Sequence, residues 1–526
     1  MPDSLPVRPT APAPPAERPI LVPGETCWRI ARADRVSLIV DARDYFAAAK
    51  AVMLTARRRI MMIGWDFDLQ IRLEPDRPDA RQPDRLGDFV QDLVTSRPGL
   101  CAYILKWDMA ALKTITRQII PLLAMRWLTL RRIRFRLDSR HPLDACHHQK
   151  LLVVDDSAAF CGGIDMTRDR WDTQDHREAD PCRVEPDGTA YGPFHDVAAM
   201  FDGEAAAALG ELARRRWRLA GGRRLLPVPL RRVEWPERGA SVSMRDVDIA
   251  IARTEPAYGR EPGAREIQAL YLAAIAAARR TIYLESQYLS SSAIADALAR
   301  RLEEPDGPEI VVVNPESAEG WLESWSMDTA RCRIVNALRR ADRHDRFRIY
   351  HPVNAAGTPI YVHAKVMVID DRLLRVGSSN LNNRSMGFDT ECDVAIDAAG
   401  QRDEAALRTA IVGFRTRLLA EHLDVPAEEL EAATAGGSLV AAIDRLRRDQ
   451  GRSLRPLAVR EVGETEAALL DLDPFNPESP RQRERRVAHL IKGAVSRAGP
   501  LAAGVAVGLG VAAASRWAAR WWVRRR

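Results

Sequence analysis

The sequence has few cysteines, and their spacing matches neither disulfide pairs nor metal fingers. Its 526 residues include seven, at Cys27, Cys101, Cys146, Cys161, Cys182, Cys332 and Cys392. Such scattered positions predict neither a disulfide scaffold nor a cysteine-based zinc site, and they are typical of a protein kept in a reducing compartment. We therefore expect a cytoplasmic protein.

The N-terminus also lacks the apolar run of an export signal. Residues 1–25 contain eight prolines and no apolar stretch long enough for a signal peptide. We interpret them as a disordered, proline-rich leader, and we do not expect Sec-type export.

Charge is modest overall but uneven along the chain. The formal net charge is +6, and basic residues concentrate near the end, on both sides of residues 498–515, which carry no charge. This uncharged stretch is just long enough to span a bilayer, but its alanine and glycine content also suits a helix lying on the membrane or buried in protein. We interpret residues 491–526 as a basic tail that anchors the protein to the inner (cytoplasmic) membrane.

What the sequence does contain, twice, is the pattern H-x-K-x-x-x-x-D. The two copies are His148, Lys150 and Asp155, and His363, Lys365 and Asp370. One copy alone would be interpreted as a surface pair, but a second copy in a matching context indicates function. In an extended segment, residues two apart face the same side, so each histidine and its lysine are predicted to share a cleft.

The flanking segments repeat as well. Residues 151–154 and 366–369 are apolar runs, and each is followed by an acidic turn, a short strand and a loop of small residues. Gly162 and Gly377 each fall fourteen residues after their histidine. Such a loop can bring backbone N–H groups close to a phosphate oxygen.

An internal repeat extends well beyond the motifs. A helix-like segment leads into a strand-like one at 47–59 and 60–65, and again at 269–280 and 281–285. Further strands are predicted in matching order at 102–105, 133–137, 309–313 and 346–350. We therefore expect two α/β halves, at 26–225 and 226–425, followed by a helical and linker region at 426–490.

Over about residues 28–425 the chain resembles the phospholipase D superfamily. Besides the two motifs, the resemblance rests on the segments 162–172, 192–196, 283–288 and 377–384, with the sequences GGIDMTRDRWD, GPFHD, YLESQY and GSSNLNNR. It implies two pseudo-symmetric α/β/α halves with one active site at their interface. It implies no metal and no cofactor.

A phosphodiester needs a nucleophile, an acid and cationic groups to be cleaved, and the duplicated motif can supply all three. One imidazole attacks phosphorus and forms a phosphohistidine, while the other protonates the departing alcohol. The resemblance implies that His148 is the nucleophile and His363 the acid and base, although the symmetry leaves the reverse open. Lys150, Lys365 and Asn380 are predicted to bind the nonbridging phosphate oxygens.

The two halves differ where Asp165 stands in the place of Asn380, each seventeen residues after its histidine. A carboxylate would repel a phosphate, so we expect Asp165 to point away from the site. The motif aspartates Asp155 and Asp370 are expected to stabilise turns. Of two further histidines, we expect His147 to serve packing and consider a supporting role near the cleft for His195.

An attacking histidine also needs a carboxylate on its other ring nitrogen to fix the tautomer. The resemblance places such a group at Glu391 in the second half. In the first half we assign it to Asp180, with Asp172 and Glu178 as alternatives.

Three classes of function fit these residues. The first is a phospholipase D-type phosphodiesterase or phosphatidyltransferase that acts on glycerophospholipids with water or an alcohol as acceptor. The second is a cardiolipin synthase-type transferase, and the third is a nucleic-acid phosphodiesterase. We favour the first class, with a phospholipid substrate, a membrane surface and no nucleic acid as partners. Because both motifs lie in one chain, we expect a monomer.

Overall fold

A computed structural model describes residues 19–79, 81–108, 131–318, 321–463, 466, 476–478 and 482. The first half comprises β1 (Arg29–Val40), α1 (Ala42–Leu54), β2 (Arg59–Gly64), α2 (Leu86–Ser96), β3 (Cys101–Trp107), β4 (Ile133–Asp138), β5 (Leu151–Val154), β6 (Ala158–Gly162), β7 (Phe194–His195), β8 (Val197–Asp202) and α5 (Gly203–Leu219).

The second half begins with β9 (Met244–Glu255), β10 (Ala264–Arg265), α6 (Glu266–Ala277), β11 (Thr281–Glu285), β12 (Leu289–Ser290), α7 (Ser292–Glu303), β13 (Glu309–Val313) and α8 (Trp321–Ala341). It continues with β14 (Phe347–Val353), β15 (Tyr361–Val362), β16 (Val366–Ile369), β17 (Leu373–Gly377), β18 (Leu381–Asn382), α9 (Asn383–Gly387), β19 (Glu391–Asp397) and α10 (Glu404–Leu423). The last described elements are α11 (Ala427–Thr434), α12 (Leu439–Leu446) and β20 (Ser453–Pro456).

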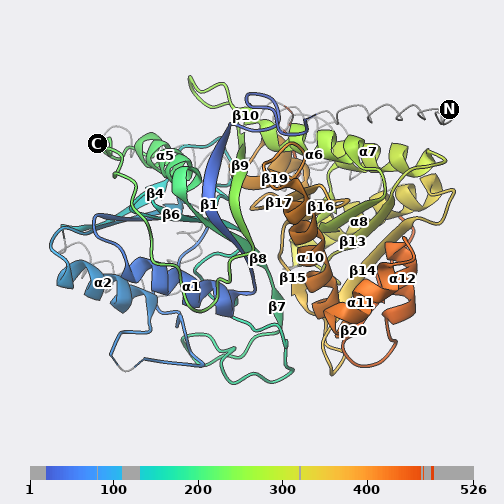
Figure 1. Ribbon diagram of the computed structural model, residues 1–526, viewed down its shortest axis with the longest axis horizontal. Coiled ribbons are helices and arrows are strands. Elements are labelled where there is room, and N and C mark those ends of the chain that lie inside the picture. The colour runs from blue at the N-terminus through green and yellow to red at the C-terminus, as the bar shows by residue number, and fades with distance from the viewer. Residues whose placement is uncertain are drawn as a thin grey trace, which may run out of the picture.

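The strands of both halves join in one large sheet with an internal pseudo-twofold symmetry. From one edge to the centre the order is β4-β3-β2-β5-β6-β8-β1, and from the centre outward it is β9-β19-β17-β16-β11-β13-β14, with β20 at the far edge. The long strands β1 and β9 pair antiparallel at the centre, as Figure 1 shows, with Arg29 opposite Ile251 and Val36 opposite Met244. Each strand of the first half therefore has a counterpart in the second.

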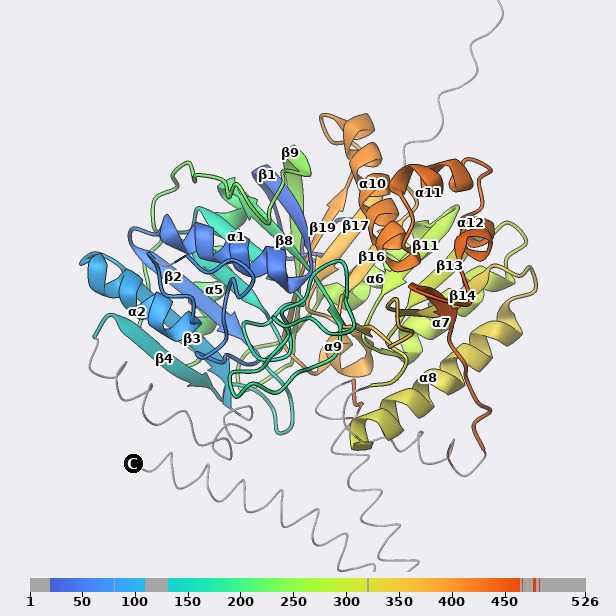
Figure 2. The same ribbon diagram turned by 90° about the horizontal axis from the view of Figure 1, so that it is seen from below.

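Helices cover both faces of this sheet. Figure 2 shows α1 and α2 over the first half, and α6 to α8 with α10 to α12 over the second. One hydrophobic core is shared by the halves, because Leu209 of α5 and Leu418 of α10 belong to the same buried cluster as Val36 of β1 and Ile251 of β9. The halves are thus joined by a continuous apolar interior as well as by strand pairing.

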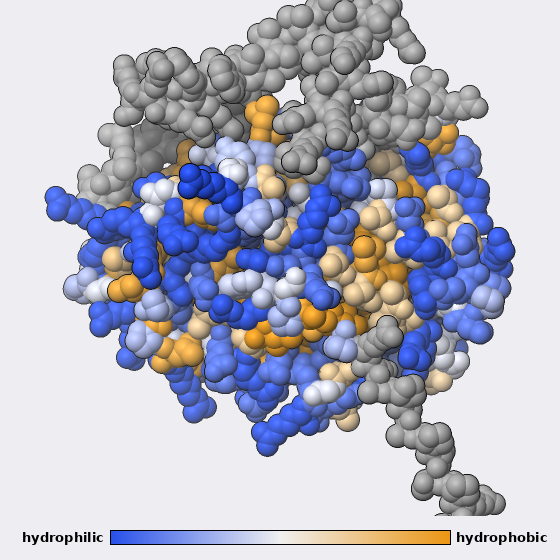
Figure 3. Space-filling view, turned by 90° about the horizontal axis from the view of Figure 1, so that it is seen from above, coloured by the Kyte–Doolittle hydropathy of each residue, from blue (hydrophilic) through white to orange (hydrophobic). Residues whose placement is uncertain are grey.

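This architecture confirms the expected α/β fold with two pseudo-symmetric halves. The region after residue 425 contains α11 and α12, and it also adds β20 to the sheet beside β14, which the sequence did not predict. The face seen in Figure 3 is mostly hydrophilic, with apolar residues in small groups between polar ones. Among the residues that the structure describes, no helix has both the length and the apolar character needed to cross a bilayer. The tail expected at 491–526 lies outside them.

Candidate active site

Each histidine of the two motifs is held by a segment from the opposite half. His148 lies just before β5, and its backbone N–H donates to the carbonyl of Thr390 at 2.9 Å. His363 lies just before β16, and its N–H donates to the carbonyl of His195 at 2.8 Å. The two motifs therefore meet where the halves join.

The residues that follow these carbonyls are carboxylates that hold the histidine rings. Glu391 places its oxygens 2.9 and 3.0 Å from Nδ1 of His148, and Asp196 places Oδ2 2.7 Å from Nδ1 of His363. Both carboxylates are fully buried. When the carboxylate is ionised and the ring is neutral, an Nδ1–H that donates to the carboxylate leaves Nε2 with a lone pair, as a nucleophile or a general base requires; a further proton on Nε2 makes the ring a general acid.

Burial and neighbouring charge shift the pKa values of these pairs. The pKa of both histidines lies well below the usual value, first because they are buried and then because Lys150 and Lys365 repel the imidazolium form. Burial raises the pKa of Glu391 to about 8 and that of Asp196 to about 7. Since both lysines act on both histidines, the four motif side chains lie close enough for their charges to influence one another.

The two lysines have different neighbours. Nζ of Lys150 lies 3.0 Å from Oδ2 of Asp165, whereas Nζ of Lys365 lies 3.5 Å from Oε1 of Gln287 and donates to the backbone carbonyl of His363. Asp165 therefore does not point away from the site as expected. Its second oxygen accepts from the backbone N–H of Trp65 at 3.1 Å, so Asp165 ties Lys150 to the end of β2.

Burial also lowers the pKa of the Lys365 ammonium to about 7. Asp196 opposes this shift, because its carboxylate favours the charged lysine. A phosphate anion in the site would favour the charged form in the same manner.

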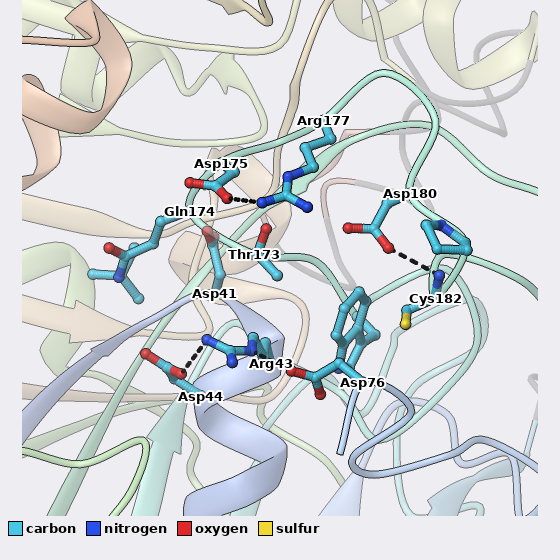
Figure 4. A pocket seen from close by; sticks show the side chains of 13 residues that line it. Asp41, Arg43, Asp44, Asp76, Thr173, Gln174, Asp175, Arg177, Asp180 and Cys182 are labelled. Carbon is cyan, nitrogen blue, oxygen red and sulfur yellow. Dashed lines mark hydrogen bonds and ion pairs between the residues drawn. The ribbon is translucent and has the colours of Figure 1, made fainter. Parts of the chain in front are cut away.

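The structure corrects the expectation for Asp180. Its Oδ1 accepts from the backbone N–H of Cys182 at 2.9 Å, and its side chain lines a hollow (Figure 4) whose lining residues include neither motif histidine. The two alternatives to Asp180 also contact residues other than the motif histidines. Asp172 contacts Arg183 and His176, and Glu178 accepts from the side-chain amide of Asn354.

Sequence reasoning missed Asp196 as the first-half carboxylate, although it singled out the segment GPFHD that contains it. Glu391 is the first residue of β19, and Asp196 immediately precedes β8, the counterpart of β19 in the sheet. The first half places a longer connection between Gly162 and this strand, so the spacing from the histidine differs from that in the second half. A strand-by-strand comparison of the repeat is the signal that could have identified Asp196.

The small-residue loop after β17 orients Glu391. Oγ of Ser378 and Oγ of Ser385 donate to the two carboxylate oxygens at 2.5 and 2.7 Å. Asn380 lies between them in sequence, is only 4 % exposed, and its side-chain carbonyl has no hydrogen-bond partner among the described residues. This oxygen remains available to a hydrogen-bond donor, whereas the side-chain NH2 of Asn380 is the group that can donate to a phosphate oxygen.

The motif aspartates contact backbone, in agreement with a structural role. The carboxylate of Asp155 accepts from the N–H groups of Arg57, Arg58 and Arg59 at 2.6 to 2.8 Å. Asp370 accepts in the same way from the three residues that lead into β11, at 2.7 to 2.9 Å. Each aspartate also has a positive φ, 50° and 53°, which Asp tolerates better than most residues.

Two further histidines are fully buried. Nδ1 of His147 lies 2.7 Å from Oγ1 of Thr390, so His147 packs between the halves as expected. Among the described residues, the ring of His195 makes no hydrogen bond or ion pair with a motif side chain. Its carbonyl accepts from His363, and its ring lies in a cluster of carboxylates that includes Glu285.

Comparisons with known proteins agree with this geometry. A family model described as "Cardiolipin synthase, PLD-like domain" matches residues 271–408, and one described as "Phospholipase D" matches residues 340–477. Phospholipase D beta 2 of Arabidopsis thaliana is 23% identical over 513 residues, which cover 70% of this chain and 55% of that protein. Cardiolipin synthase A of Escherichia fergusonii is 25% identical over 291 residues, which cover 53% of this chain and 51% of that protein.

The chain thus spans about half the length of these curated relatives. Among solved structures, phosphatidylserine synthase of Haemophilus influenzae superposes with a TM-score of 0.49 at 11% identity, covering 72% of this chain and 85% of that one. The duplicated motif, the sheet built from two equivalent halves and the matching family models lead to one conclusion. The chain belongs to the phospholipase D superfamily.

Proposed function

We propose that this protein is a phospholipase D-type phosphodiesterase or phosphatidyltransferase that cleaves glycerophospholipid headgroups through a phosphohistidine. The observation that carries the proposal is the crossed pairing of Glu391 with His148 and of Asp196 with His363. It holds Nδ1 of both imidazoles at a single site, so that Nε2 of one ring, when neutral, can attack while Nε2–H of the other ring, when charged, can donate a proton.

The reaction proceeds in two steps. In the first, Nε2 of the neutral His148 attacks phosphorus while His363, which enters this step as an imidazolium because the phosphate anion favours that form, donates its Nε2 proton to the leaving alcohol oxygen. In the second, His363 takes a proton from water or an alcohol, whose oxygen attacks phosphorus and releases His148. Because the site is pseudo-symmetric, the roles of the two histidines could be exchanged without altering this balance.

The groups proposed to bind the phosphate are Lys150, Lys365 and Asn380. Charge on the nonbridging oxygens grows as the nucleophile adds, and buried cationic and amide donors stabilise that charge more strongly than water does. Glu391 and Asp196 act behind the histidines and do not touch the phosphate. We propose that one chain suffices, because it carries both motifs.

A cardiolipin synthase-type transferase is the second candidate. The family model over residues 271–408 and the similarity to cardiolipin synthase A favour it. It would use the same two histidines and two lysines, with a lipid alcohol as acceptor. A nucleic-acid phosphodiesterase is a weaker candidate.

The test is to incubate the full chain with vesicles of phosphatidylcholine or of phosphatidylglycerol, with and without a primary alcohol, and to identify the products. Phosphatidic acid or a phosphatidyl-alcohol supports the first candidate. Cardiolipin and glycerol formed from phosphatidylglycerol alone support the second. His148→Ala and His363→Ala should each abolish turnover. Equal cleavage by the double alanine variant, or cleavage of DNA without action on any lipid, would contradict the proposal.

We also propose that residues 491–526 anchor the protein to a membrane. Deleting residues 498–526 and comparing the membrane and supernatant fractions tests this separately from activity. Loss of the shortened chain from the membrane fraction supports an anchor. Its retention there would assign membrane binding to the folded halves.

A further inference from the structure

Behind the active site, the two halves bury a second group of ligand-type side chains that the proposed reaction does not use. Asp41, His176 and His195 come from the first half, and Glu421 comes from α10 in the second. The side chains of the first three are at most 1 % exposed and that of Glu421 is 5 % exposed. One ligand atom from each lies within 4.8 Å of the others.

The inner atoms of these side chains converge on one point. Nδ1 of His195 lies 3.1 Å from Oδ1 of Asp41 and 3.1 Å from Oε1 of Glu421. Nε2 of His176 lies 3.2 Å from the same oxygen of Glu421 and 3.6 Å from Oδ2 of Asp41. In a tetrahedral site with bonds of about 2.0–2.1 Å, neighbouring ligand atoms lie about 3.3 Å apart.

The outer ring nitrogens are fixed by other carboxylates. Nδ1 of His176 lies 2.9 Å from Asp172, and Nε2 of His195 lies 3.0 Å from Glu285. A carboxylate on the outer nitrogen sets the tautomer so that the inner nitrogen presents a lone pair, which is the usual arrangement behind a metal-bound histidine. Both inner nitrogens here point at the shared centre.

Several inner atoms lack the hydrogen bonds that buried polar atoms normally make. Nδ1 of His195 and Oδ2 of Asp41 face the centre but make no well-aligned hydrogen bond with any described residue, although both lie close to charged neighbours, and the outer oxygen Oε2 of Glu421 makes none either. Asp41 also adopts φ 66° and ψ 155°, a conformation that is strained for any residue except glycine. A hydrogen-bonded cluster that served packing alone would explain neither feature.

We propose that Asp41, His176, His195 and Glu421 bind one divalent transition-metal ion, with Zn²⁺ the best fit. Two imidazoles and two carboxylates suit Zn²⁺ better than Ca²⁺ or Mg²⁺, which prefer oxygen ligands alone. All four positions are filled by protein, as in structural zinc sites. The ion would neutralise the two buried carboxylates.

The four proposed ligands, called the cage from here on, adjoin a hollow in the surface at Asp41, which Figure 4 shows among the lining residues. This hollow has a volume of about 450 Å³, and its other acidic side chains are Asp44, Asp76, Asp175 and Asp180, with Arg43 and Arg177 among them. A cation entering from solvent would meet these carboxylates first. The acidic hollow thus adjoins the buried cage at Asp41.

The ion would hold the two halves together directly behind the active site. His195 precedes Asp196, which orients His363, and the carbonyl of His195 accepts the backbone N–H of His363. Glu421 reaches the cage from the other half. The ion is a structural clamp in this proposal and takes part in no step of the reaction, so its test does not depend on the proposed activity.

The first test uses the full-length protein without substitutions. Its metal content is measured after purification, and the metal-stripped protein is titrated with Zn²⁺, Co²⁺ or Ca²⁺ while its Tm is recorded. We expect one Zn²⁺ per chain, a Tm that rises with Zn²⁺ but not with Ca²⁺, and the intense visible absorption of tetrahedral Co²⁺. Absence of bound metal together with a Tm insensitive to Zn²⁺ would overturn the proposal and show that protonated histidines pair with the carboxylates instead. A Tm that responds to Ca²⁺ and not to Zn²⁺ would overturn the assignment of the ion.

Variants then locate the ion. Glu421→Gln should remove the Zn²⁺-dependent rise in Tm, and Asp172→Asn, which acts through His176, should weaken Zn²⁺ binding by about 10- to 100-fold. His141→Gln is the matched control, because His141 is fully buried beside Asp108 but lies outside the cage. It should bind Zn²⁺ as the unaltered protein does. If Glu421→Gln retains the ion, or His141→Gln loses it, the cage is not the site. If Glu421→Gln does not fold, the Co²⁺ spectrum of the unaltered protein decides.

Discussion

The carboxylate of Asp196 lies 2.7 Å from Nδ1 of His363, which it reaches from the opposite half of the molecule. Glu391 makes the reciprocal contact with His148. Neither half therefore supplies the carboxylate that pairs with its own motif histidine. The site forms only when β1 and β9 bring the halves together, so the folding of each half and the assembly of the site are coupled.

The first prediction concerns Asp196. Asp196→Asn keeps the size of the side chain but removes the charge that holds the tautomer of His363, and we expect kcat to fall by about three orders of magnitude. Asp180→Asn is the matched control, because the side chain of Asp180 accepts a hydrogen bond from the backbone N–H of Cys182 and lies in no contact described with the motif histidines. Its kcat should equal that of the unaltered protein. A large loss in Asp180→Asn with full activity in Asp196→Asn would reverse our assignment.

The second prediction concerns the pH dependence of stability set by the pair His148 and Glu391. In the folded protein the pKa of His148 lies well below its usual value and that of Glu391 is raised to about 8, so the pair holds one proton across neutral pH. In the unfolded chain it holds two protons below about pH 4.3 and none above about pH 6.5. Stability falls with rising pH wherever the folded state binds more protons.

The free energy of unfolding should therefore decrease by about 1 kcal/mol between pH 6.5 and 8 through this pair. Glu391→Gln cannot hold the proton and should remove that part of the slope, even if the variant is less stable at every pH. Urea denaturation of both proteins at several pH values measures the difference. Parallel curves for the two proteins would mean that Glu391 is ionised throughout this interval.

The third prediction uses the difference between Asp165 and Asn380. Asp165 lies 3.0 Å from the Lys150 ammonium and competes with a phosphate for it. Asp165→Asn should strengthen inhibition by inorganic phosphate about tenfold, since a like charge is removed from the site. It should also lower the free energy of unfolding, because Lys150 then lacks its buried partner in the absence of phosphate. The reciprocal variant Asn380→Asp should weaken phosphate inhibition. Identical inhibition constants in all three proteins would place the phosphate elsewhere.

The sequence predicted the buried strands, because these depend on the order of apolar residues over a few neighbouring positions. The strands at 60–65, 281–285 and 309–313 lie within a residue of β2, β11 and β13, because a short apolar run between turns is sufficient to define a buried strand. The crossed carboxylates depend instead on contacts between residues far apart in the chain, such as β7 with β15. Asp196 lies 48 residues after His148, the motif histidine of its own half, whereas Glu391 lies 28 residues after His363. No common spacing therefore revealed Asp196.

The cage of Asp41, His176, His195 and Glu421 was beyond sequence reasoning for the same reason. Its members are spread over almost the whole described chain, without the short intervals of known metal motifs. Only the packing of α10 of the second half against the first half brings Glu421 to the histidines. Sites built from residues distant in sequence are decided by tertiary structure.

The last prediction separates stability from catalysis within the motif itself. Asp370 accepts three backbone N–H groups ahead of β11 and occupies a left-handed turn, so Asp370→Ala leaves three donors without a partner and introduces backbone strain. We expect the free energy of unfolding to drop by about 3 kcal/mol, while kcat of the folded fraction stays unchanged because the carboxylate touches no reacting group. The neighbouring Asp371→Ala removes only a half-exposed ion pair with Arg408 and should lower stability by less than about 1 kcal/mol. A variant Asp370→Ala that kept full stability but lost kcat would give the third residue of the motif a direct part in the reaction.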